Sequence, residues 1–294
     1  RENVMALEVV LADGQIIQTG TRARKSSAGY DLTHLFVGSE GTLGIITRIT
    51  VRLFGQPEAI MAATCAFETV DGAVDSVMDA MQLGLPMARI ELLDDVQMRG
   101  MNIYNPDMKL PETPHLFLEF HGSESGVAEQ VETFTAIAEE HGGSDLQWAT
   151  RTEDRTRLWQ ARHDAYYAAK ALVPGAEGYV TDCCVPIDKL AVAIRRAQAA
   201  IDESGLVAPI LGHVGDGKFH LVILIRPDDE AELKAANDLA GILNLMSIEL
   251  GGTMTGELGV GLGKKKYRPA EQGDSYALMG VIKKAIDPQN IMNP

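Results

Sequence analysis

Two histidines, His213 and His220, lie on either side of a Gly215-Asp216-Gly217 turn. An Asp-Gly pair between two apolar runs predicts a β-hairpin with a two-residue loop. With Asp216 and Gly217 in that loop, His213 would stand opposite His220, where Cβ atoms are about 4.5–5.5 Å apart. Two imidazoles at that separation can bind one divalent cation at about 2.0–2.1 Å per bond. The hairpin therefore predicts part of a metal site, against the alternative of two ordinary packing histidines.

A second glycine-rich segment, residues 251–261, carries one carboxylate, Glu257. Glycines let a backbone turn tightly and come close to a ligand. Two neutral imidazoles and one carboxylate are a common catalytic metal set, which leaves coordination positions open for a substrate. Glu257 is therefore the expected third ligand beside His213 and His220. A plain loop that ends a long helix explains the same pattern equally well.

Two further stretches have residue types that suit small-molecule binding. Residues 38–47 form a glycine-rich turn whose backbone amides could line the polar edge of a cofactor, although the spacing matches neither dinucleotide-binding nor P-loop motifs. Arg162 lies among aromatic residues in segment 158–167, and a guanidinium there suits bidentate binding of a carboxylate. The alternatives are a simple turn that leads into a strand and a solvated surface arginine.

Composition limits the kinds of protein that this chain can be. Its 294 residues are 46% hydrophobic and 23% charged, which suits about two globular domains. The net charge of −15 argues against nucleic acid or an anionic membrane surface as a partner. Three cysteines, two of them adjacent, form no disulfide framework and fit a reducing compartment. No transmembrane run is visible, and the way both ends are cut leads us to expect a fragment of a longer protein.

Hydrophobic periodicity predicts strands that alternate with helices. Gly55-Gln56-Pro57 marks a boundary between a β-rich beginning and the remainder. The expected strands are a hairpin within 7–20 and runs at 44–54, 61–67, 88–93, 116–120 and 179–185. The expected helical stretches are 71–83, 126–140, 153–172, 186–204 and 229–249. This order indicates an α+β fold in which an antiparallel sheet is covered on one face by helices.

Taken together, four stretches resemble the FAD-linked oxidase family of D-2-hydroxyacid dehydrogenases. They are 38–47 (family pattern G-S-E-G-T-L-G-I-I-T), 212–220 (G-H-V-G-D-G-N-F-H), 255–261 (T-G-E-H-G-I-G) and the closing Asp-Pro … Met-Asn-Pro of 287–294. The family includes D-lactate dehydrogenases, the flavin subunit of glycolate oxidase and D-2-hydroxyglutarate dehydrogenases. Within it, the chain is most similar to D-lactate dehydrogenases of the cytochrome-coupled type.

The resemblance implies a domain plan and a set of site residues. Residues 1–57 would be the C-terminal part of an FAD-binding domain, 58–285 the substrate and metal domain, and 286–294 a segment that returns to the FAD. Arg162, His213, His220 and Glu257 would be catalytic, with Arg162 taking the substrate carboxylate and the other three holding Zn²⁺ or Mn²⁺. The residues implied to lie along the FAD are Glu40, Gly41, Thr42, Gly44, Ile45, Ile46 and Asn293.

The resemblance also implies a reaction, the oxidation of a small D-2-hydroxyacid such as D-lactate to its 2-oxoacid. The metal would polarise the hydroxyl group, and the α-hydrogen would leave as hydride to the flavin. A cytochrome or an electron-transfer flavoprotein would take the electrons. Alternatives are D-2-hydroxyglutarate dehydrogenase, a glycolate oxidase subunit, and a degenerate binding subunit without catalysis. The expected location is cytoplasmic, or peripheral at the inner membrane, or mitochondrial in a eukaryote, and a homodimer is one option.

Three departures from the family pattern bear on activity. Leu258 stands where the family has a histidine that resembles a general base, and losing such a base costs on the order of 10²–10⁴ in rate. Lys218 replaces the family's asparagine, so that a cation stands at the turn, where it would repel the metal or reach the substrate carboxylate. The glycine-rich loop that cradles the FAD diphosphate is not among these residues, so we expect the chain alone to bind FAD weakly or not at all.

Overall fold

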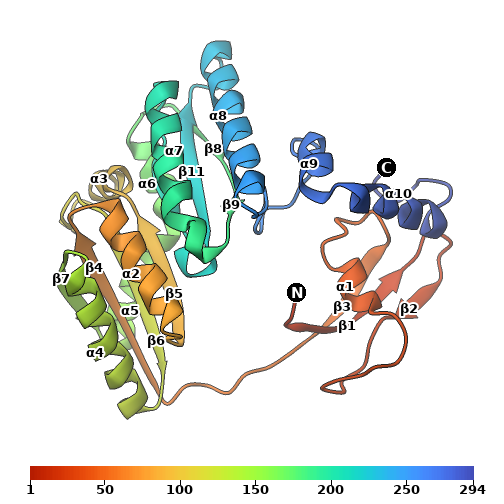
Figure 1. Ribbon diagram of the computed structural model, residues 1–294, viewed down its shortest axis with the longest axis horizontal. Coiled ribbons are helices and arrows are strands. Elements are labelled where there is room, and N and C mark those ends of the chain that lie inside the picture. Colours follow the sequence, from red (N-terminus) through yellow and green to blue (C-terminus); the bar gives the residue numbers. More distant parts are fainter. The chain divides into compact units, whose positions relative to one another are not determined.

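The chain divides at Pro57 and again after Leu258. A computed structural model describes residues 1–294 as two units, one made of residues 1–56 with 259–294 and the other of residues 57–258 (Figure 1). The first division falls at the expected boundary. Residues 259–285, which we expected within the substrate domain, group with the N-terminal segment instead. The assignment of flavin and substrate domains to these units stays a prediction.

The first unit is built on a three-stranded antiparallel sheet in the order β2–β1–β3. The strands are β1 (Val4–Val10), β2 (Ile16–Gln18) and β3 (Ile45–Val51), and the helices are α1 (Leu32–Phe36), α9 (Arg268–Gln272) and α10 (Asp274–Ile286). The hairpin expected within 7–20 is confirmed, since Val10 pairs with Ile16. A small core that includes Leu7, Val9 and Phe36 joins this sheet to α10 through Ile282 and Ile286.

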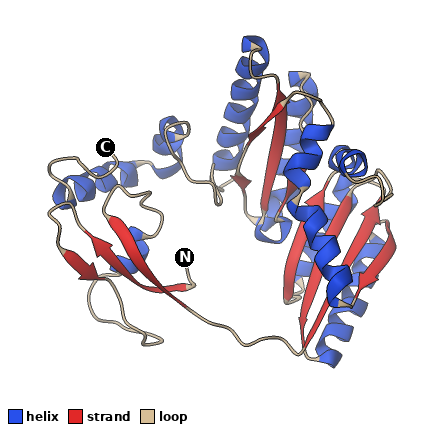
Figure 2. Cartoon of the chain, turned by 180° about the vertical axis from the view of Figure 1, so that it is seen from behind, coloured by secondary structure: helices blue, strands red, loops and turns tan.

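The second unit contains an eight-stranded antiparallel sheet, visible as the larger group of red strands in Figure 2. Its order is β7–β4–β6–β5–β10–β11–β8, with β9 also paired to β11. The strands are β4 (Ala59–Phe67), β5 (Met87–Leu93), β6 (His115–Gly122), β7 (Gly143–Ala149), β8 (Glu177–Val180), β9 (Cys183–Cys184), β10 (Ile210–Gly212) and β11 (Lys218–Ile225). The antiparallel sheet and the α+β class agree with the sequence-based prediction.

Helices cover both faces of this sheet, so the expectation of one covered face is wrong. One core contains α2 (Val70–Gln82), α4 (Glu124–Glu140), α7 (Leu190–Ser204) and α8 (Glu230–Glu249). The opposite core contains α3 (Asp95–Tyr104), α5 (Thr152–His163) and α6 (Ala165–Ala171). Figure 1 shows α7 and α8 side by side along β11.

The sequence of β11 explains why helices cover both faces of the sheet, because all eight residues of this strand are buried. Phe219 and Leu221 pack into the first core, whereas Val222 and Leu224 pack into the second. A continuous apolar run is typical of a strand that is buried on both faces, whereas a half-exposed strand alternates. None of the helices combines the length and the apolar character that crossing a bilayer requires.

Two expected elements are interrupted, and both interruptions lie near the candidate site. The stretch 153–172 forms two helices, α5 and α6, which are separated at Asp164. The run 179–185 is divided into β8 and β9 by Thr181 and Asp182. Both of these polar residues are buried, so the break brings hydrogen-bonding groups into the interior beside β11.

Asp94 connects the start of α3 to the centre of the sheet. Its Oδ1 accepts a hydrogen bond from the N–H of Gln97 at 2.7 Å, and its Oδ2 accepts one from the N–H of Ile210 in β10 at 2.8 Å. The side chain is buried, and burial raises the pKa of this carboxyl to about 7. Asp94 thus serves one helix as its N-cap and one strand as a hydrogen-bond acceptor.

We expect Asp94→Ala to lower the free energy of unfolding by about 2–4 kcal/mol, because a helix cap is lost and a buried N–H is left without a partner. Urea denaturation followed by circular dichroism measures this loss. The matched control is Asp95→Ala, next along the chain but exposed, which should cost less than about 1 kcal/mol. Equal losses in the two variants would contradict the bridging role of Asp94.

Candidate functional site

The histidine hairpin has a different register from the one expected. Leu211 lies opposite His220, and Val214–Asp216 form a turn of 3₁₀ helix. The predicted pairing of His213 with His220 across a two-residue loop is therefore wrong. A type I′ loop needs positive φ at both central residues, and here Gly217 has φ of 71° while Asp216 is not among the residues with positive φ. The wider turn places His213 just beyond the end of β10.

The structure nevertheless brings the three expected ligands together. The rings of His213 and His220 have centroids 6.4 Å apart. Glu257 lies between them, with Oε1 3.2 Å from Nε2 of His220 and Oε2 3.7 Å from Nε2 of His213. One ligand atom from each side chain lies within 4.8 Å of the other two. The two glycine-rich turns found in the sequence thus meet at one point.

Contacts of the two Nδ1 atoms set the orientation of the His213 and His220 rings. Nδ1 of His220 lies 2.6 Å from the carbonyl oxygen of Thr181, and Nδ1 of His213 contacts Oε1 of Glu91. Burial is the largest influence on His220 and lowers its pKa, which favours the neutral ring. With a proton on each Nδ1, both Nε2 lone pairs point toward the Glu257 carboxylate. Lone pairs and a carboxylate that face one another fit a cation between them.

Glu91 in β5 is a site residue that the sequence analysis missed. Its Oε2 accepts hydrogen bonds from Nε and Nη2 of Arg162 at 3.0 and 2.9 Å, while Oε1 contacts His213. Burial raises the pKa of Glu91, but the hydrogen bond with His213 and the charge of Arg162 outweigh it, so that the pKa is lowered overall. A single carboxylate within the apolar run Ile90–Leu93 was the available signal.

Arg162 reaches the site from α5, as its assignment to substrate binding requires. Its side chain is 16% exposed, and Glu91 takes the Nε and Nη2 edge of the guanidinium. Nη1 is not part of that pair and remains for another acceptor. The role of Arg162 toward a substrate stays a prediction.

Asp182 anchors the second glycine-rich turn and is fully buried. Its Oδ2 accepts hydrogen bonds from the N–H groups of Glu257 and Leu258 and from the hydroxyl of Thr255, at 2.7 to 3.0 Å. Burial raises the pKa of Asp182, but these bonds, led by that of Leu258, lower it overall. The negative charge of Asp182 thus fixes the backbone that carries Glu257. The side chain of Leu258 itself is 57% exposed.

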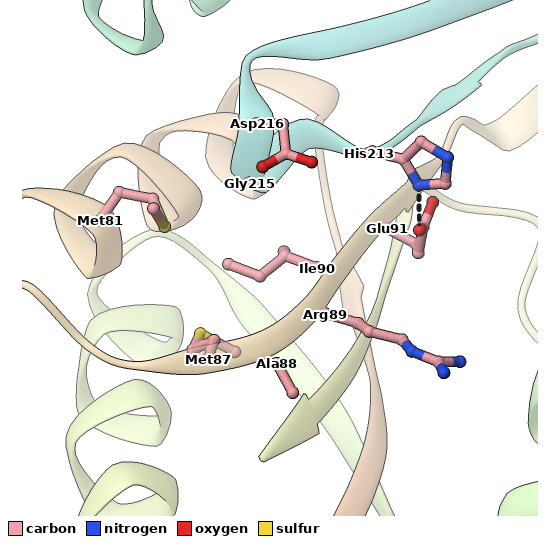
Figure 3. A pocket seen from close by; sticks show the side chains of 9 residues that line it. All are labelled: Met81, Met87, Ala88, Arg89, Ile90, Glu91, His213, Gly215 and Asp216. Atoms are coloured by element: carbon pink, nitrogen blue, oxygen red, sulfur yellow. Dashed lines mark hydrogen bonds and ion pairs between the residues drawn. The ribbon is translucent and has the colours of Figure 1, made fainter. Parts of the chain in front are cut away.

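A pocket of about 270 Å³ adjoins the site. In Figure 3 the Glu91–His213 pair lies on one side of it, Gly215 and Asp216 lie at its top, and apolar side chains lie opposite the pair. The apolar part of the lining consists of Met81, Met87, Ala88 and Ile90. A small molecule in this space would meet His213 directly.

The residues implied to lie along the FAD belong to the first unit, where two of them meet. The side-chain amide of Asn293 donates to the carbonyl oxygen of Glu40 at 2.6 Å. The Glu40 carboxylate accepts from the N–H groups of Val260 and Gly261 at 2.7 and 2.9 Å. Lys283 of α10 donates to the carbonyl oxygen of Thr42 at 2.9 Å. The turn at 38–47 and the end of the chain are therefore joined, and their contact with a flavin stays a prediction.

We expect Glu91→Gln to lower the free energy of unfolding by about 3 kcal/mol, because it leaves the largely buried Arg162 without its counter-charge. Since the native pKa of Glu91 is lowered, the difference from the wild type should be present above about pH 4.5 and shrink as the pH falls further. Urea denaturation at pH 7 and at pH 3.5 tests both statements.

The matched control is Glu177→Gln, which removes the carboxylate of an exposed pair with Lys170. Its effect should stay below about 1 kcal/mol. A loss as small as this in Glu91→Gln, or one that does not change with pH, would contradict the account of Glu91.

Comparison with known proteins places the chain in a family. A model of the C-terminal domain of FAD-linked oxidases matches residues 56–294. Over its whole length the chain is 49% identical to a probable mitochondrial D-lactate dehydrogenase of Danio rerio, of which it covers 60%. It is 43% identical to a mitochondrial cytochrome-type D-lactate dehydrogenase of Arabidopsis thaliana, of which it covers 52%. It is 35% identical to a glycolate oxidase subunit of Bacillus subtilis and covers 63% of it.

Among solved structures, 99% of the chain superposes on 65% of a 4-ethylphenol oxidase from Gulosibacter chungangensis, with a TM-score of 0.76 and 18% identity. At that identity the likeness concerns the fold alone. The chain spans about half to two thirds of the length of these relatives. With the match over residues 56–294 and the similarity along its full length, this chain belongs to the family of FAD-linked oxidases and contains their C-terminal domain.

Proposed function

We propose that the chain is part of an FAD-dependent enzyme that oxidises a small D-2-hydroxyacid, with D-lactate as the first candidate. The main support is that one face of the sheet places a guanidinium, Arg162, beside a set of two imidazoles and one carboxylate. A 2-hydroxyacid has a carboxylate for the first group and a hydroxyl oxygen for a cation held by the second. The relatives named D-lactate dehydrogenase add support along the whole chain.

The residues divide the work in the following way. Arg162 binds the substrate carboxylate through Nη1 while Glu91 holds the other edge of the guanidinium in position. His213, His220 and Glu257 hold a divalent cation, Zn²⁺ or Mn²⁺, both of which accept imidazole and carboxylate ligands. Such a cation, when bound, supplies Lewis-acid polarisation of the substrate hydroxyl. Glu91 and Thr181 keep the protons on Nδ1, so that both Nε2 atoms stay available.

The oxidation removes one proton and one hydride, and the chain must provide for the proton. FAD, when bound, would supply the two-electron acceptor for the hydride. Leu258 stands at the position where the family pattern has histidine, and its hydrocarbon side chain accepts no proton. We therefore propose slow turnover in this chain, limited by the missing base.

The remaining assignments follow from the same proposal. Glu40 to Ile46 and Asn293 lie along the flavin, residues 1–56 with 259–294 form part of an FAD-binding domain, and residues 57–258 bind the substrate. A cytochrome or an electron-transfer flavoprotein takes the electrons, since three relatives have cytochrome in their names. A mitochondrial location applies in a eukaryote, as named for these relatives. The glycolate oxidase subunits at up to 35% identity make glycolate the second candidate substrate.

Anaerobic mixing of the intact flavoprotein with D-lactate should bleach the flavin absorbance, whereas L-lactate should not.

Arg162→Gln should raise the KM for D-lactate about 10- to 100-fold, because a charge-assisted hydrogen bond to the carboxylate is lost. Arg157→Gln, an exposed position of the same helix, is the matched control and should leave KM unchanged. An unchanged KM in Arg162→Gln, or no bleaching by D-lactate or glycolate, would refute the corresponding part of the proposal.

Leu258→His should raise the rate of flavin reduction by about 10²–10⁴, because it restores a general base at the family position. Stopped-flow absorbance with saturating D-lactate measures this rate. Leu262→His, at another exposed leucine close by in the chain, should have no effect. If the wild type reduces the flavin as fast as Leu258→His does, position 258 is not the place of the general base. No reduction in either protein would favour a binding subunit without catalysis.

A further inference from the structure

Lys218, at the start of β11, is the only lysine or arginine among the buried residues of the chain. Its side chain is 5% exposed and passes directly over Gly256. A Cβ atom at position 256 would lie 2.9 Å from Cδ and 3.0 Å from Cε of Lys218, closer than such atoms pack. The glycine at 256 therefore provides the space through which the lysine reaches the candidate metal centre.

The ammonium group of Lys218 lies beside the carboxylates of Glu257 and Asp182. Nζ contacts Oε1 of Glu257 and lies 3.6 Å from Oδ1 of Asp182. The same Oε1 lies 3.2 Å from Nε2 of His220. The oxygen that a metal would share with His220 is thus already engaged by a positive charge.

The local charges determine what this contact does to a metal. Glu257 and Asp182 contribute two negative charges and Lys218 one positive charge, while Arg162 balances Glu91. A divalent cation that binds Glu257 comes within contact distance of the ammonium and is repelled by it. Lys218 is buried but Glu257 is 47% exposed, so salt screens this repulsion in part.

We propose that Lys218 is a resident cation of this centre, which holds Glu257 in place when no metal is bound and competes with a divalent metal for it. The inference depends on the proposed role of His213, His220 and Glu257 as metal ligands. The family pattern has a neutral asparagine at this position, so the competition is a property of this chain. Metal binding then requires the ammonium to leave Oε1 of Glu257.

The test is a titration of the intact protein with Mn²⁺. Isothermal titration calorimetry and the electron paramagnetic resonance signal of free Mn²⁺ both measure the dissociation constant. Lys218→Asn and Lys218→Gln should lower the dissociation constant roughly 10- to 100-fold, the size of effect typical of groups that surround a metal's ligands. Lys218→Arg, which keeps the charge, should retain weak binding. Lys234→Gln removes an exposed lysine of α8 and should change nothing.

Thermal unfolding gives a second readout and shows whether the variants fold. Without metal, Lys218→Asn should melt at a lower temperature than the wild type, because Asp182 and Glu257 lose their counter-charge. Saturating Mn²⁺ should raise the melting temperature of the variant more than that of the wild type. The same rise in both proteins would contradict a competition between the lysine and the metal.

A third arm separates this inference from the proposed metal centre. Adding His213→Ala to Lys218→Asn should abolish the gain in affinity, and persistence of the gain would overturn the inference because the metal would lie elsewhere. Wild-type binding as tight as that of Lys218→Asn, and sensitive to His213→Ala, would overturn the role of Lys218 alone and leave the metal centre standing. No binding in any of these proteins would overturn both.

Discussion

A charge inside a protein is tolerated only when an opposite charge or several hydrogen bonds meet it, and this constraint organises the whole centre. Glu91 and Asp182 are buried carboxylates, and Lys218 is a buried ammonium. Arg162 and His213 contact Glu91, backbone N–H groups donate to Oδ2 of Asp182, and Glu257 contacts Lys218. His213 and Glu257 are therefore held in position by their contacts with buried charges, Glu91 and Lys218.

The antiparallel sheet supplies the geometry that this cluster needs. Successive residues of a strand point to opposite faces, so Lys218 and His220 share one face of β11 while Phe219 packs into the core behind it. Glu91 faces the same way from β5, and Arg162 reaches this face from α5. The break between β8 and β9 adds Thr181 and Asp182. Helices on this face bury Glu91, Asp182 and Lys218, while the side chains of His213 and Glu257 remain 39% and 47% exposed.

The sequence identified three side chains that lie close together, but not their arrangement. His213, His220 and Glu257 could be found because glycine-rich turns mark places where the backbone comes close to a ligand. The register of the hairpin could not, because the φ of Asp216 depends on contacts distant in sequence. Glu91 escaped notice because local hydrophobicity shows a strand but not what the strand faces. The edge strand β7 and the helices α3 and α10 also went unpredicted, since segments such as GSDLQWA have no clear apolar period. The other long helices and strands were recognised from their apolar patterns.

The central claim is that His213, His220 and Glu257 form a metal centre whose carboxylate is shared with Lys218. The most direct measurement is anomalous X-ray diffraction from crystals of the intact protein grown in saturating Mn²⁺. The account predicts one strong anomalous peak in contact with both Nε2 atoms and with Glu257, at about 2.0–2.3 Å, and an ammonium that has moved away from Oε1. A Lys218–Glu257 contact that persists without any anomalous peak at these side chains would contradict it.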